Sequence, residues 1–109
     1  MANTISHDHV RNVAEVQISE SGVTPAAVQV DVGFQPRFVK AENISERVGL
    51  EWHENMAAAA ALKSVAAGTR TQITTLGITV GSTGFTVGLD TDLLPTHTGN
   101  NVIQCLVIG

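Results

Sequence analysis

A few short groups of residues in this chain of 109 residues have side chains that could do chemistry. His7-Asp8-His9 combines two imidazoles with a carboxylate, a set of ligands that suits a divalent metal ion. In an extended segment, however, residues 7 and 9 point to one side and Asp8 to the other. His53 and His97 are isolated in the sequence and complete no cluster. We therefore expect a solvated polar segment here and no metal site.

The other candidate groups also have simpler structural interpretations. Asp90-Thr91-Asp92 resembles the start of a calcium loop but lacks its glycine and closing glutamate, so we expect a turn. Glu51 and His53 would share one face of a strand and could act as an acid–base pair. Cys105 has apolar neighbours, which predicts a buried thiol and not a nucleophile.

Motifs that would complete an active site are missing from the sequence. No GxSxG nucleophile motif and no phosphate-binding glycine loop is present. We therefore expect no enzyme and no cofactor. Asn43-Ile44-Ser45 fits the glycosylation pattern, but nothing in the sequence indicates secretion.

Composition excludes several classes of partner. The net charge is -4 and the six Lys and Arg are dispersed, which argues against a nucleic-acid binder. No apolar run reaches the roughly 18 residues of a membrane span. The single cysteine cannot form an intrachain disulfide, and we expect a reducing compartment. Charged residues make up 15% of the chain against about 25% in typical domains, so partner surfaces are expected to cover part of it.

Alternation of apolar and polar residues predicts a mainly β fold, a small antiparallel sandwich or barrel of about seven or eight short strands. One short Ala-rich helix is expected over Met56–Ala67, with Asn55 as cap and Gly68 at its end, although a compact Ala-rich loop is the alternative. The strands are predicted at Ala14–Ser19, Val28–Val32, Arg37–Glu42, Arg47–His53, Thr71–Thr75, Ile78–Val80, Phe85–Val87 and Val102–Ile108.

The domain organisation follows from the same patterns. Residues 1–12 are polar and predict an N-terminal arm, whereas residues 13–109 predict a single β-rich domain. Period two places Trp52, the only Trp, on the face of Val48 and Leu50, which favours a core or interface position over stacking on a ligand. The residues expected in the core or at a subunit interface are Val30, Phe38, Leu50, Trp52, Leu62, Phe85 and Leu106.

Several segments resemble small virion structural proteins of tailed bacteriophages. The resemblance covers about Val32 to Gly88, roughly half of the chain. Its segments are Gly33-Phe34-Gln35-Pro36-Arg37-Phe38-Val39, Trp52 with Met56-Ala57-Ala58, Ala61 to Thr71, Gly77-Ile78-Thr79-Val80 and Gly84-Phe85-Thr86-Val87.

Within that class, the chain is most similar to a head decoration (cement) protein in its length, β content, low charge and polar arm. The resemblance implies a homo-oligomer, with a trimer favoured, on the outer surface of the virion head, where its partner is the major capsid protein. It also implies synthesis in the bacterial host cytoplasm. A tail, baseplate or fibre module for host attachment is the alternative.

An arm running from Ile5 to Ile18 could add a strand to a capsid sheet edge. The residues expected to contact the capsid or another partner are Ile5, Val10, Arg11, Val16, Ile18 and Arg37.

Overall fold

A computed structural model describes residues 12–109, which form one antiparallel sheet of eight strands in the order β1-β8-β3-β4-β5-β6-β7-β2. The mainly β prediction is therefore confirmed. The strands are β1 (Val13–Ser21), β2 (Val28–Asp31), β3 (Phe38–Asn43), β4 (Val48–His53), β5 (Ala60–Ser64), β6 (Arg70–Val80), β7 (Gly84–Val87) and β8 (Asn100–Ile108).

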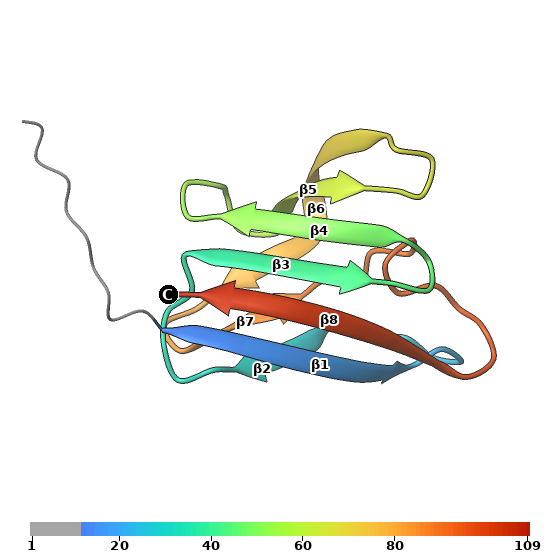
Figure 1. The fold of residues 1–109 in the computed structure, drawn as a ribbon, viewed down its shortest axis with the longest axis horizontal. Coiled ribbons are helices and arrows are strands. Elements are labelled where there is room, and N and C mark those ends of the chain that lie inside the picture. The colour runs from blue at the N-terminus through green and yellow to red at the C-terminus, as the bar shows by residue number, and fades with distance from the viewer. Residues whose placement is uncertain (1–11) are drawn as a thin grey trace, which may run out of the picture.

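The sheet curls round on itself so that one face of every strand points inward (Figure 1). In that view β1, β8, β3 and β4 form the front, while β7 and β2 lie behind them; β5 lies near the top, and β6 starts above it and runs down behind the front strands. The two ends of the sheet are β1 and β2, and no pairing joins them. The curl therefore remains open along one side, between β1 and β2.

Strand β8 lies between β1 and β3 and pairs with both. Its residues alternate between exposed and buried from Asn100 to Val107, as expected for a strand with one face in the core. The buried set includes Ile103, Cys105 and Val107. The last nine residues before Gly109 thus join the first described strand to the middle of the sheet.

The core is built largely from aliphatic side chains, with Trp52 and Phe85 as its largest aromatic members. Among the residues expected in the core or at an interface, Leu50, Trp52 and Phe85 are buried. Val30, Phe38 and Leu62 are partly buried, and Leu106 lies on the outer face with 37% of its surface exposed. The indole Nε1 of Trp52 donates a hydrogen bond to the Ala57 carbonyl at 3.2 Å, so the polar atom of this side chain is satisfied by its own chain.

The helix predicted over Met56–Ala67 is wrong: the described residues contain no helix, and Ala60–Ser64 form strand β5. Helix propensity is a weak preference that tertiary contacts override, and a segment of this length is marginal as an isolated helix. In the fold, Ala60 and Ala61 are buried between β4 and β6. Alanine suits this place because its small side chain allows neighbouring backbone to come close.

The predicted strands Thr71–Thr75 and Ile78–Val80 are one strand, β6, with an irregularity in the middle. Ala60 pairs with Ile78 and Ala61 with Ile73, so the residues between 73 and 78 form a bulge. Leu76 has a φ of 61° in this bulge and is half exposed. A Cβ on Gly77 would lie 2.6 Å from the Ala60 carbonyl oxygen, so only glycine fits against β5 here.

The segment after β7, in which the sequence predicts a turn at Asp90-Thr91-Asp92, also supplies core residues. Leu93 and Leu94 are fully buried, and the Nδ2 of Asn43 donates a hydrogen bond to the Leu93 carbonyl at 2.8 Å. Asp90 begins the turn, since its Oδ1 accepts hydrogen bonds from the backbone N–H groups of Asp92 and Leu93. The loop therefore covers part of the core.

Replacing Leu50 by Ala should lower the free energy of unfolding by about 2–5 kcal/mol, because it leaves a cavity among fully buried side chains. Leu106→Ala is the matched control: it removes the same atoms from the outer face of the sheet and should change stability by about 0.5 kcal/mol. Urea denaturation followed by Trp52 fluorescence measures both. Equal losses in the two variants would contradict the assignment of inner and outer faces.

Candidate partner-binding surface

One end of the sheet gathers the start of the described chain, its C-terminus and Arg37. The backbone N–H of Gly109 donates to the Asn12 carbonyl at 2.7 Å, and the N–H of Arg37 donates to the Ile108 carbonyl at 2.7 Å. We call this region the arm end, because residues 1–11 precede it in the chain; it comprises Asn12, Val13, Phe34, Arg37, Phe38, His53, Glu54, Ile108 and Gly109. In Figure 1 it lies at the left, where β1 and β3 begin and β8 ends.

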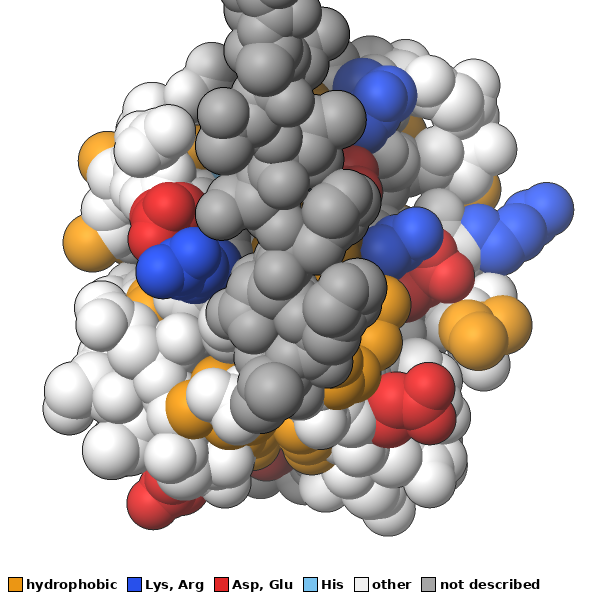
Figure 2. Space-filling model, turned by 60° about the vertical axis from the view of Figure 1, so that its left-hand side comes forward, with side chains coloured by type: hydrophobic (Ala, Val, Ile, Leu, Met, Phe, Trp, Pro, Cys, Tyr) orange, Lys and Arg blue, Asp and Glu red, His pale blue; other side chains and the backbone are white. Residues whose placement is uncertain are grey.

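Apolar side chains are incompletely covered at the arm end. Val13 is 56% exposed, and Phe34 and Ile108 are only partly buried. The Phe34 ring lies against Gly109, where an added Cβ would be 2.4 Å from the ring. Figure 2 brings this side of the molecule forward and shows hydrophobic side chains with acidic and basic side chains around them. Apolar surface surrounded by charged groups is typical of a protein-binding surface.

The charged groups of the arm end are free to change partners. The Nε of Arg37 lies 3.5 Å from a carboxylate oxygen of Glu54, and the two side chains are 64% and 61% exposed. An exposed ion pair of this kind contributes little to stability, from about 0 to 1 kcal/mol. The guanidinium can therefore bind a carboxylate of another molecule without a large loss of folding free energy.

The residues predicted to contact a partner do not form one group. Ile5, Val10 and Arg11 lie outside the described residues. Val16 is partly buried on β1, and Ile18, 8% exposed, belongs to the core of its own chain. Arg37 is at the arm end. Because β1 pairs with β8 from Val13 onward, Val16 and Ile18 belong to the sheet of the domain and not to a separate arm.

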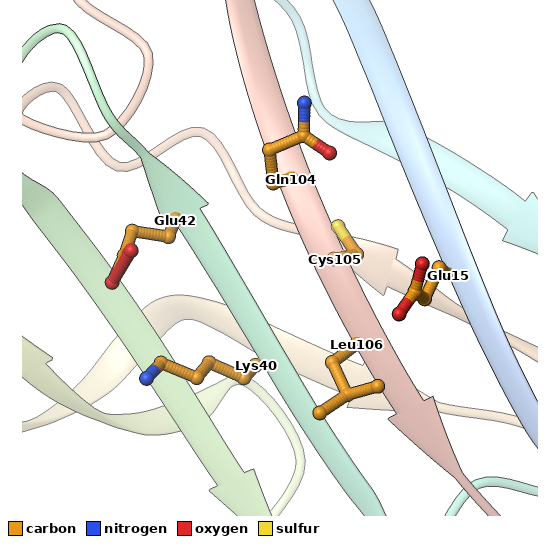
Figure 3. Close-up of a pocket in the computed structure, with 6 residues that line it drawn as sticks. All are labelled: Glu15, Lys40, Glu42, Gln104, Cys105 and Leu106. Carbon is orange, nitrogen blue, oxygen red and sulfur yellow. The ribbon is translucent and has the colours of Figure 1, made fainter.

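A second candidate surface is a shallow depression of about 340 Å³ on the outer face of β1, β8 and β3 (Figure 3). Leu106 and Gln104 lie along its floor on β8, Glu15 lies on β1, and Lys40 and Glu42 lie on β3. In the register of the sheet, Leu106 is directly opposite both Glu15 and Lys40. The depression thus places an exposed apolar side chain between two opposite charges, a combination that can bind a peptide side chain but contains no catalytic pair.

Glu51 and His53, the predicted acid–base pair, interact with different groups. The carboxylate of Glu51 accepts a hydrogen bond from Arg70 at 3.0 Å. The His53 ring packs edge-on against Phe38 with ring centroids 5.1 Å apart. No hydrogen bond or ion pair joins Glu51 to His53, both of which lie in the described part of the chain.

Asp90 and Asp92 bind an ammonium of their own chain. The Lys63 Nζ lies 3.0 Å from Asp90 Oδ2 and 2.6 Å from Asp92 Oδ2, and the Lys63 side chain is only 15% exposed. Burial disfavours the ammonium, but hydrogen bonds to Asp92 and Asp90 outweigh it and raise the pKa of Lys63. This cluster ties the loop after β7 to β5, a structural role that the sequence pattern did not reveal.

Cys105 and Asn43 are both interior residues. Burial raises the pKa of the Cys105 thiol to about 12, so it is a protonated and unreactive thiol at neutral pH. Asn43 is 1% exposed, and its amide is engaged with Leu93, so the Asn43-Ile44-Ser45 pattern is not an accessible glycosylation site in the folded chain.

His97 is held by two acceptors at the end of the loop after β7. Its Nε2 lies 2.6 Å from Asn101 Oδ1 and its Nδ1 lies 2.7 Å from the Thr98 carbonyl. The Nδ2 of Asn101 donates to the Pro95 carbonyl, which fixes Oδ1 toward the histidine. Both ring nitrogens can donate to these two oxygens at once only when the ring is protonated. The hydrogen bond to Asn101, that to Thr98 and the nearby charge of Glu46 raise the pKa of His97.

Residues 12–109 include no cluster of three or more His, Cys, Asp or Glu that could hold a metal ion, and His7-Asp8-His9 lies outside them. No helix in this part of the chain is long and apolar enough to cross a membrane. No protein-family model, curated protein or solved structure gives a significant match to the chain.

The sequence did not identify the arm end as a surface. Val13, Phe34 and Ile108 come together only through the pairing of β1 and β3 with β8. Phe34 belongs to one of the segments of the bacteriophage resemblance, and this was the only signal at that position. The depression on β8 could have been found from the alternation of Gln104 and Leu106 with the buried residues of β8.

Stability should fall as the pH rises above about 6.5, because a raised pKa in the folded state means that protonation of His97 stabilises the fold. The contribution is fully present below the unfolded-state pKa and is lost as pH passes through the higher folded-state value. We expect the free energy of unfolding of the His97→Gln variant to lack this fall with rising pH. Urea denaturation of both proteins from pH 5.5 to 8.5 measures it, and an unchanged pH dependence in the variant would contradict the assignment.

Proposed function

We propose that the chain is a bacteriophage capsid decoration protein, which binds the outer surface of the assembled head as a homo-oligomer and stabilises it. The observation on which the proposal depends is the arm end: incompletely covered apolar side chains and a replaceable ion pair surround the point where residues 1–11 join the sheet. The resemblance of Val32 to Gly88 to small virion proteins supports the same assignment.

The physical mechanism is linkage between binding and shell stability. A protein that binds the assembled shell, but not its separated subunits, lowers the free energy of the shell and opposes its rupture. Each contact can be weak, because the several arms of one oligomer bind at high effective concentration. The exposed Val13 and the exposed Arg37 side chain, whose pair with Glu54 contributes little to stability, suit such contacts. Val13 supplies apolar area and Arg37 an ionic contact.

The major capsid protein is the proposed partner, and the surface of the virion head is the proposed location. Residues 1–11 of each copy would extend from the arm end across the neighbouring capsid surface. The arm end itself would lie against the shell, so that the outer faces of β1, β8 and β3 remain at the side of the molecule. A tail or baseplate position would use the same adhesive surface, and location within the particle distinguishes the two.

Removing residues 1–11 while keeping Asn12, whose carbonyl accepts the Gly109 N–H, should lower the affinity for heads by at least about tenfold, or about 1.4 kcal/mol. Arg37→Glu should also weaken binding, since it replaces the exposed cation of the arm end. The measurement is occupancy on purified heads that lack the protein, by sedimentation over a range of concentrations.

Arg47→Glu is the control for Arg37→Glu, because it makes the same change of charge in the exposed turn between β3 and β4, at the opposite end of β3. It should leave occupancy unchanged. Circular dichroism and Trp52 fluorescence establish that each variant is folded. Full occupancy by the folded, truncated chain would contradict the proposal.

A further inference from the structure

The outer edge of β1 is a long strand edge without a partner among the described residues. β1 pairs with β8 along all nine residues from Val13 to Ser21, and no other strand pairs with it. At the opposite end of the sheet, β2 has only four residues. In an antiparallel ladder, alternate residues of an edge strand direct their N–H and C=O groups away from the neighbouring strand, so β1 presents a row of unpaired donors and acceptors.

This edge lacks several of the features by which proteins protect such strands, although Glu15 and Glu20 place two charges on it. The sequence from Val13 to Ser21 contains no proline, lysine or arginine, and its register with β8 has no bulge. Ala14 and Val16 pack against the core but remain partly exposed. A strand added to this edge would therefore gain backbone hydrogen bonds and cover apolar surface together.

The strand is complementary to a second copy of itself. Two identical strands related by a two-fold axis pair antiparallel. Directly opposite residues must either both direct their N–H and C=O groups toward the partner strand or both direct them away from it. The axis must therefore pass between two copies of the same residue. An axis at Gln17 pairs all nine residues, whereas an axis at Val16 or Ile18 pairs fewer. Gln17 is exposed on the outer face, opposite Gln104 of β8.

The side-chain pairs that this register creates are compatible. On the inner face Val16 is opposite Ile18 of the second copy, and on the outer face Glu15 is opposite Ser19. The two carboxylates of β1, Glu15 and Glu20, lie on different faces of the strand, so no two are directly opposite. Although each copy has a net charge of -4, no two carboxylates face each other directly across the paired strands.

We propose that β1 is a self-association edge at which two copies of this chain pair antiparallel about Gln17, joining their sheets into one continuous sheet. The depression on β1, β8 and β3 is then repeated on each side of the axis. This interface involves neither residues 1–11 nor Arg37, so it can be tested without heads and independently of the proposed function.

Cysteine cross-linking tests the register. In the paired copies the two Gln17 Cα atoms would be about 4.5–5.5 Å apart, within the range of a disulfide. Under mild oxidation, Gln17→Cys should therefore give a disulfide-linked dimer as the main species on a non-reducing gel. Ser19→Cys is the matched control on the same strand and face. Its two copies would be about 13 Å apart along the strand and should remain unlinked.

The wild-type chain is the control for Cys105, which is buried and should form no linked dimer. Light scattering supplies a measurement that needs no cysteine. The wild-type protein should have the mass of a dimer, or of a larger oligomer built from such dimers. Gln17→Lys, which places two ammonium groups face to face, should raise the dimer dissociation constant at least about tenfold while leaving the fold intact.

Three results would overturn the proposal: a monomeric wild-type protein at all concentrations, an oligomer that Gln17→Lys does not weaken, or equal cross-linking of the two cysteine variants. If Gln17→Lys fails to fold, the cross-linking of Gln17→Cys against Ser19→Cys still decides the register.

Discussion

The position of β8 between β1 and β3 is the constraint on which the rest of this structure depends. The last strand of the chain pairs with the first described strand on one side and with the middle of the sheet on the other. Its buried residues supply one wall of the core, and its last carbonyl binds Arg37. Without this pairing β1 would have no strand partner among residues 12–109. The arm end, the outer depression and the open edge of β1 all exist because of it.

Both proposed surfaces are suited to adhesion. The arm end combines an exposed Val13 and partly buried aromatic side chains with an ion pair that stabilises the fold little. Strand β1 presents unpaired backbone groups. Two of the titratable groups with a perturbed pKa have structural partners instead: Lys63 binds Asp90 and Asp92, and His97 binds Asn101. The pKa of the third, Cys105, is raised by burial. The two proposed surfaces meet at Val13, which belongs to both the arm end and β1.

Much of the sheet was predictable because strand periodicity is a local property. The alternation around Val48, Leu50 and Trp52 identifies β4 and its buried face correctly. The strand β5 in the Ala-rich segment was not predictable, because the local propensity favours a helix while burial between β4 and β6 requires a strand. The cover formed by Leu93 and Leu94, and the meeting of Val13, Phe34 and Ile108, depend on contacts between distant segments, which periodicity does not encode.

The most direct test of the adhesive function is the location and number of copies in purified particles, by cryo-electron microscopy together with quantitative mass spectrometry. The account predicts density for the eight-stranded sheet on the outside of the head, repeated with the symmetry of the shell, and a copy number that scales with that of the major capsid protein. Density confined to the tail or baseplate, with only a few copies per particle, would contradict it.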